Sequence, residues 1–166
     1  MTEGTKSLLI GCHNFIIHPF MVIKAWRWWF GTWPKPWQIV CIFIHDFGLA
    51  GRQYLSDPAA KKGHWRLGAA WAERLFGEKG FLFCAGHTPE SMAPRSDLWY
   101  ADKASWIVAP IWWLWMNYYL DVSSNGIRVS NPYQFRLWIA QNLAAQNHFG
   151  AHQLYLEETK RIREEY

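Results

Sequence analysis

Apolar residues recur along this chain at intervals of three and four residues, and few stretches alternate between apolar and polar residues. The first spacing lines up apolar side chains on one face of an α-helix, whereas a half-buried strand alternates with a period of two. With 166 residues, 51% of them hydrophobic, the chain is long enough to bury one core. The sequence therefore predicts an all-α protein in which residues 1–166 form a single helical domain.

Prolines, glycines and one serine divide the chain into expected helices and loops. Pro19 and Pro36 suit first helical turns, since a proline there loses no hydrogen bond that the helix needs. We expect helices at roughly 19–30, 36–48, 64–76 and 80–86, and a long helix that follows Ser96 as N-cap and bends at Pro110. Segments 49–63, 87–96 and 121–132 are predicted to be loops, and the remainder one or two amphipathic helices ending in the solvated charge run EETKRIREEY.

Charge and cysteine content narrow the class of protein. The formal charge is +4, which favours an anionic partner, but the basic residues are scattered and give no strong nucleic-acid signal. The three cysteines lie in apolar sequence without a CxxC spacing, as expected of reduced core thiols. The first residues lack the pattern of a signal peptide, and we expect a cytoplasmic protein.

Residues 104–120 are the one segment that resembles a membrane span. They carry no charge over 17 residues, but they include Pro110 and Asn117 and fall short of a full span. We therefore expect a buried helix and no transmembrane segment. The 13 tryptophans leave peripheral membrane contact open, because indole rings suit both wet and apolar neighbours.

Histidines and aspartates stand singly at expected helix ends or beside apolar runs. His45 and Asp46 end the run CIFI, and the others are His18, His64, His87 and Asp102. A hydrolytic metal site needs neutral imidazoles and ionised carboxylates from several helices. These ligands must number fewer than the full coordination shell, so that water or substrate can take the open positions. Adjacent residues on a helix point about 100° apart, so other helices must complete a shell begun by His45 and Asp46. Asp46 could also bridge two ions.

The ordered set His, His-Asp, His, His, Asp resembles the HD-domain superfamily of metal-dependent phosphohydrolases. His64 in GHWRLGAAWAERLFG is similar to the family's H-P-x-x-G-A helix, and SDLWYADKAS is similar to the segment that supplies its last aspartate. The likeness covers about residues 13–105 and leaves 106–166 as C-terminal helices. It implies an HD-domain-like helical bundle around a metal site.

The resemblance also implies roles for individual residues. The first ion would be held by His18, His45, Asp46 and Asp102, and the second by His64, His87 and bridging Asp46. The cofactor would be one or two divalent ions of manganese, iron, zinc, cobalt or magnesium. Lys103 matches the family lysine and would hold a substrate phosphate as a point charge. His13 is the alternative first ligand, and His18 is preferred because the MVIKAW that follows it fits the family's helix better.

Three functions fit these residues. The leading one is hydrolysis of a nucleotide-type phosphoester or phosphoanhydride, a small anionic substrate, by metal-activated water, with Asp46 and Lys103 as catalytic residues. The second is a diiron oxygenase on the same ligand set. The third is a non-catalytic protein that binds a nucleotide, either to sequester it or to act as an inhibitor. The sequence fixes neither the oligomeric state nor the substrate.

Overall fold

The computed structural model describes residues 1–53, 59, 62–120 and 131–145, and this part of the chain is all-helical, as predicted. The α-helices are α1 (Glu3–Ile10), α2 (Ile17–Phe30), α3 (Pro36–Ile44), α5 (Trp65–Phe76), α6 (Glu78–Ala85), α7 (Asp97–Val108), α8 (Ile111–Leu120) and α10 (Pro132–Ala144). Two short 3-10 helices are η1 (Phe47–Leu49) and η2 (Pro89–Ser91).

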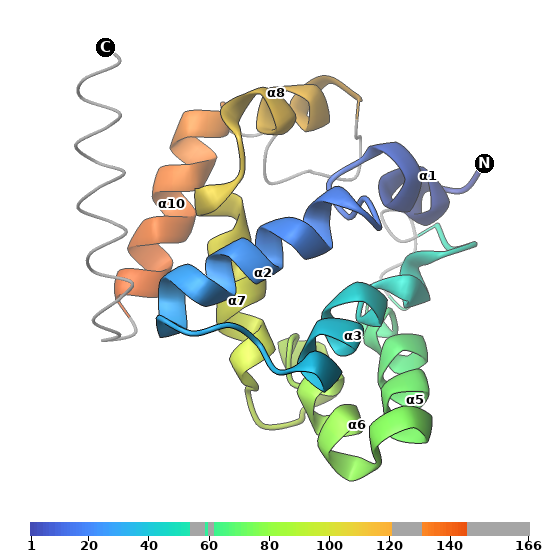
Figure 1. The fold of residues 1–166 in the computed structure, drawn as a ribbon. Helices are drawn as coiled ribbons and strands as arrows, with labels where there is room; N and C mark the ends of the chain where they lie inside the picture. Colours follow the sequence, from blue (N-terminus) through green and yellow to red (C-terminus); the bar gives the residue numbers. More distant parts are fainter. Residues whose placement is uncertain (54–58, 60–61, 121–130, 146–166) are drawn as a thin grey trace.

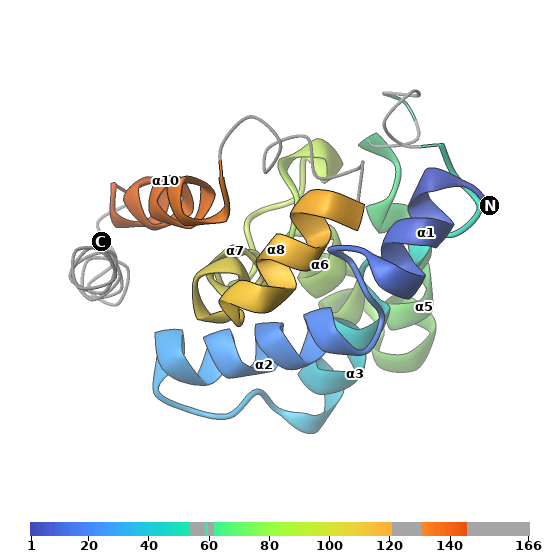
Figure 2. The same ribbon diagram turned by 90° about the horizontal axis from the view of Figure 1, so that it is seen from above.

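Helices α2 and α7 pack against each other and cross at the centre of the molecule (Figure 1). On one side of this pair lie α3 and the α5–α6 hairpin, and on the other lies α10 (Figure 2). Helix α8 follows α7 and packs against α10. Both central helices contribute to two apolar clusters, one shared with α3, α5 and α6 and one shared with α8 and α10. Because α7 is covered on nearly every side, polar residues along it must find partners inside the protein.

Most expected helices are present, with shifted ends. The expected helices at 19–30, 64–76 and 80–86 correspond to α2, α5 and α6. Helix α5 ends at Phe76, and Gly77 after it has a φ of 70°, in the region that favours glycine. Helix α1 was not predicted from the sequence. Thr2 caps it through a hydrogen bond from the Thr5 backbone N–H.

Helix α3 ends at Ile44, four residues earlier than predicted. Nδ1 of His45 donates to the carbonyl of Ile42, the group that a continuing helix would offer to the backbone N–H of residue 46. Asp46 then adopts φ −95° and ψ 2°, a region common in turns and active sites. The change of direction takes Asp46 out of the helix.

The long helix predicted to bend at Pro110 is two separate helices, α7 and α8. Ala109 is extended, with φ −64° and ψ 145°, because a residue that precedes proline avoids the helical conformation. Ser96 does hold the N-cap position of α7, but its hydroxyl donates to the carbonyl of Phe83. Within the described residues, no helix has the length and apolar character needed to cross a membrane.

Two further predictions concern segments that lie largely or wholly outside the described residues. They are the loop at 121–132, of which only the end is described, and the C-terminal charge run. Of the helices expected after residue 132, the structure describes α10, which begins with Asn131 as N-cap and Pro132 in the first turn.

Candidate metal centre

Six side chains from five parts of the chain converge at one place. His18 lies in the first turn of α2, His45 and Asp46 follow α3, His64 precedes α5, His87 follows α6, and Asp102 lies within α7. All but His64 are buried. These are the six residues that the sequence singled out as metal ligands, and the fold brings all of them together.

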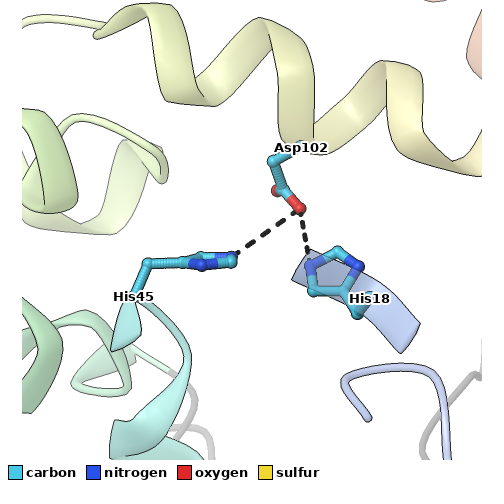
Figure 3. A group of neighbouring side chains, drawn as sticks. All are labelled: His18, His45 and Asp102. Atoms are coloured by element: carbon cyan, nitrogen blue, oxygen red, sulfur yellow. Dashed lines mark ion pairs between the residues drawn. The ribbon is translucent and has the colours of Figure 1, made fainter. Parts of the chain in front are cut away.

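The first group of ligand atoms surrounds Asp102. Its Oδ1 lies 3.1 Å from Nε2 of His18 and 3.9 Å from Nε2 of His45, and the three side chains reach this point from α7, from α2 and from the turn after α3 (Figure 3). Asp46 completes the group, because its Oδ2 lies 3.2 Å from Nε2 of His45 and 3.5 Å from Nε2 of His18. Two imidazoles and two carboxylates thus face one point.

The second group lies on the other oxygen of Asp46. Oδ1 is 3.6 Å from Nε2 of His87 and 3.9 Å from Nε2 of His64, and the two Nε2 atoms are 3.1 Å apart. His87 also lies near His45, with ring centroids 4.9 Å apart. The carboxylate of Asp46 therefore stands between two sets of histidines.

Backbone carbonyls at helix ends orient two of the histidines. Nδ1 of His45 lies 2.7 Å from the carbonyl oxygen of Ile42, and Nδ1 of His87 makes the same contact with Cys84. A carbonyl only accepts, so each Nδ1 carries the proton, and in the neutral ring the lone pair is left on Nε2. Both Nε2 atoms point into the cluster. A backbone partner that fixes the tautomer in this way is typical of metal-binding histidines.

Three buried nitrogens of the cluster's histidines, Nδ1 and Nε2 of His18 and Nε2 of His45, lack a hydrogen bond within the described part of the chain. Nε2 of His18 and Nε2 of His45 lie close to carboxylate oxygens, yet neither makes a hydrogen bond of normal geometry. A buried polar group without a partner costs about 1–3 kcal/mol. A cation among these atoms would satisfy nitrogens and carboxylates together, and the donor set suits a divalent transition ion. The residues therefore fit a bound metal.

The charges of the cluster also favour a bound cation. Burial raises the pKa of Asp46 and of Asp102, but positive charge on their neighbours, His45 beside Asp46 and Lys103 beside Asp102, holds both pKa values well below their ordinary range. Burial lowers the pKa of His45, yet the carboxylates of Asp46 and Asp102 raise it overall to about 9. Two buried carboxylates thus demand positive charge in their midst.

A close approach of α5 brings His64 to the cluster. A Cβ added to Gly68 would lie 2.6 Å from the carbonyl oxygens of Ile44 and His45, and one added to Gly48 would lie 1.7 Å from that of His64. Only glycine lets these backbones come so near. Gly68 and Ala69 are the small residues of the segment that is similar to the H-P-x-x-G-A helix, whereas nothing in the sequence marked the role of Gly48.

Lys103 lies at the edge of the cluster. Its Nζ is 2.7 Å from Oδ2 of Asp102, and its side chain is 35% exposed, compared with 15% for His64 and 10% or less for the five buried residues. Burial lowers the pKa of Lys103, but the carboxylate of Asp102 raises it overall. Solvent thus reaches the centre from the side of His64 and Lys103.

The alternative ligand, His13, lies outside both groups. Its ring centroid is 5.9 Å from that of His18, and its Nδ1 contacts the hydroxyl of Ser7 at 2.9 Å and the thiol of Cys12 at 3.1 Å. Of the two histidines, His18 is the one with a nitrogen 3.1 Å from Asp102.

Glu90 is a charged neighbour that the sequence did not reveal. It lies in η2, where its carboxylate accepts a hydrogen bond from the hydroxyl of Thr88. Burial raises its pKa, but this bond and the charges of His64 and Lys103 lower it overall. A proline-rich loop has no periodicity to mark such a residue. The available signal was that this loop joins His87 to the helix that carries Asp102.

Comparison with protein families, curated proteins and solved structures found no match to this chain. The class that the geometry defines is an all-α protein with a buried histidine and aspartate cluster suited to metal. Its resemblance to the HD superfamily rests on the ordered residues alone and stays a prediction.

Proposed function

We propose that this protein is a metal-dependent phosphohydrolase that cleaves a nucleotide-type phosphoester or phosphoanhydride. One observation carries the proposal. The two oxygens of Asp46 face different sets of histidines, Oδ2 toward His45 and His18 and Oδ1 toward His87 and His64. A carboxylate placed in this way can share two cations, and sites with two neighbouring cations are common in enzymes that act on phosphate esters.

Bound divalent cations would supply Lewis acidity and would lower the pKa of water toward neutrality. The chain's own residues would hold the cations in a fixed arrangement. Asp46 and Asp102 are ionised at neutral pH because their pKa values lie well below the ordinary range. Burial of the first group keeps bulk water away from these charges, which strengthens every charge interaction inside.

Lys103 supports a phosphate-containing substrate. Its ammonium group has three N–H donors, and Asp102 accepts from it at 2.7 Å. The remaining donors lie at the solvent-accessible side of the centre, where a phosphoryl oxygen would approach. Lys103 would therefore bind the substrate as a positive charge, and its pairing with Asp102 would fix its position relative to the cations.

Metal content and turnover together test the proposal. Protein purified without chelator, and protein reconstituted with manganese, iron, zinc, cobalt or magnesium, would be analysed for bound metal and for hydrolysis of nucleotides and of p-nitrophenyl phosphate esters. We expect bound transition metal and hydrolysis in the wild type, and loss of both in Asp46→Asn. Asp97→Asn, which removes an exposed carboxylate from the first turn of α7, is the matched control and keeps both.

Two other results would contradict the proposal in different ways. Metal binding without turnover of any phosphate ester would leave the nucleotide-binding or inhibitory protein in its place. An iron-loaded protein that reacts with dioxygen, combined with an inactive manganese form, would favour the diiron oxygenase.

A further inference from the structure

Two cysteines meet directly behind the metal cluster. Cys41 in α3 and Cys84 in α6 are fully buried, and their thiols face each other. The thiol of Cys84 also points to the backbone carbonyl of Cys41, at 3.8 Å. The two residues are 43 positions apart in the sequence, and only the packing of α3 against α6 brings them together.

Each cysteine lies one helical turn from a histidine of the cluster. The carbonyl of Cys41 accepts the backbone N–H of His45 at 3.0 Å, and the carbonyl of Cys84 accepts Nδ1–H of His87. Both histidines are thus held by the backbone of the residues whose thiols touch. A change in the distance between the two cysteines would be passed directly to the two rings.

The two thiols are placed to react as a pair: when one is oxidised, its neighbour can resolve the oxidised product. The third cysteine, Cys12, instead contacts Ser7 and His13.

We propose that Cys41 and Cys84 form an oxidation site at which hydrogen peroxide closes a disulfide between α3 and α6. The Cys41 sulfur attacks one peroxide oxygen, the O–O bond breaks, and a sulfenic acid and one water form. The Cys84 sulfur then attacks the Cys41 sulfur, the S–S bond forms, and the hydroxyl leaves as a second water with the thiol proton. Two thiols lose two electrons and two protons, and the peroxide is reduced to two waters.

We expect the disulfide to disturb the metal cluster, and this expectation rests on the proposed function. An S–S bond is about 2.05 Å long, so two thiols that are not bonded to each other must move closer. The movement draws α3 toward α6 and shifts His45 relative to His87. The oxidised protein is then expected to bind metal more weakly than the reduced protein, and dithiothreitol restores binding.

Peptide mapping of the full chain tests the disulfide itself. The reduced, folded protein is treated with hydrogen peroxide, blocked with N-ethylmaleimide in denaturant, digested without reductant and analysed by mass spectrometry. We expect a linked Cys41–Cys84 peptide in the wild type and in Cys12→Ser, and none in Cys41→Ser or Cys84→Ser. Circular dichroism before treatment confirms that each variant is folded.

Three results would overturn the oxidation site. They are linkage through Cys12, linkage only in urea-unfolded protein, and thiols that stay reduced in the folded chain.

Metal content is then measured before and after oxidation. Equal metal content in the linked and reduced forms would overturn the effect on the cluster. Reduced protein that binds no metal would instead contradict the proposed function, and the peptide map would still decide the disulfide.

Discussion

Gly68 lies against the carbonyl of His45, so closely that a Cβ on Gly68 would stand 2.6 Å from the carbonyl oxygen. This contact seats α5 on the end of α3, and it brings His64, which directly precedes α5, to Asp46. The site thus depends on a position that carries no side chain at all.

Substitution Gly68→Ala tests this contact. Helix propensity alone would stabilise the protein by about 1 kcal/mol, since alanine is the better helix former. The methyl group would push α5 away from backbone that cannot yield, and overpacking of this kind costs about 1–3 kcal/mol. We expect a lower free energy of unfolding in urea and weaker metal binding.

The matched control for Gly68→Ala is Ala70→Gly, an exposed position in the same helix. It should cost about 1 kcal/mol through helix propensity and leave metal binding unchanged. A Gly68→Ala protein more stable than the wild type would show that the two backbones are not held in contact.

His64 and His18 should differ in their effect on metal content. Of the two groups, His64 belongs to the second, whereas His18 lies 3.1 Å from Asp102 and 3.5 Å from Asp46 in the first. We expect His64→Gln to retain the ion of the first group and to lose the other, and His18→Gln to lose the ion of the first group. Elemental analysis of the two variants beside the wild type measures this difference, and equal losses in both would contradict the assignment of two groups.

The sequence was informative about the site because ligand order does not depend on helix ends. His45 and Asp46 stood out since they interrupt an apolar run, and Asp102 stood out within ADK. The same sequence could not show which oxygen of Asp46 faces which histidine. That depends on the turn after Ile44, where a side-chain hydrogen bond replaces a helical one.

Contacts between distant segments were also beyond sequence reasoning. The pairing of Cys41 with Cys84 has no spacing to mark it, because it arises from packing between α3 and α6. The break at Ala109 was predicted only as a bend. Proline fixes where a helix is interrupted, but tertiary contacts decide whether the next helix continues in line.

Protein freed of metal should lose stability as the pH rises from 6.5 to about 9. The pKa of His45 is raised from 6.5 to about 9 in the folded chain, so the folded state holds this proton more tightly than the unfolded state. The stabilisation is complete below pH 6.5 and disappears as the pH passes through about 9. Urea unfolding of chelator-treated protein across this range measures the effect.

The two aspartates determine how the stability of the metal-free protein changes at acidic pH. Their pKa values lie well below 3.8, so their contribution is present above that pH and is lost as the pH falls through the lower, folded-state values. Metal-loaded protein should not lose stability between pH 6.5 and 9, because metal takes the place of the His45 proton and binds more tightly as protons leave. A metal-free protein that gains stability across that interval would contradict the prediction.

Arg136 should support the fold without affecting the metal centre. It is fully buried in α10, and its guanidinium donates to the carbonyl of Ala109, at the break between α7 and α8. Arg136→Met keeps much of the apolar volume but removes this donor, which should cost about 1–3 kcal/mol of stability.

The exposed Arg74, replaced by Met in the same way, should change stability by no more than about 0.5 kcal/mol. Urea unfolding gives both values, and elemental analysis of folded Arg136→Met should match the wild type, since no residue of α10 belongs to the cluster. Loss of metal from a folded Arg136→Met protein would show that the break between α7 and α8 also positions Asp102.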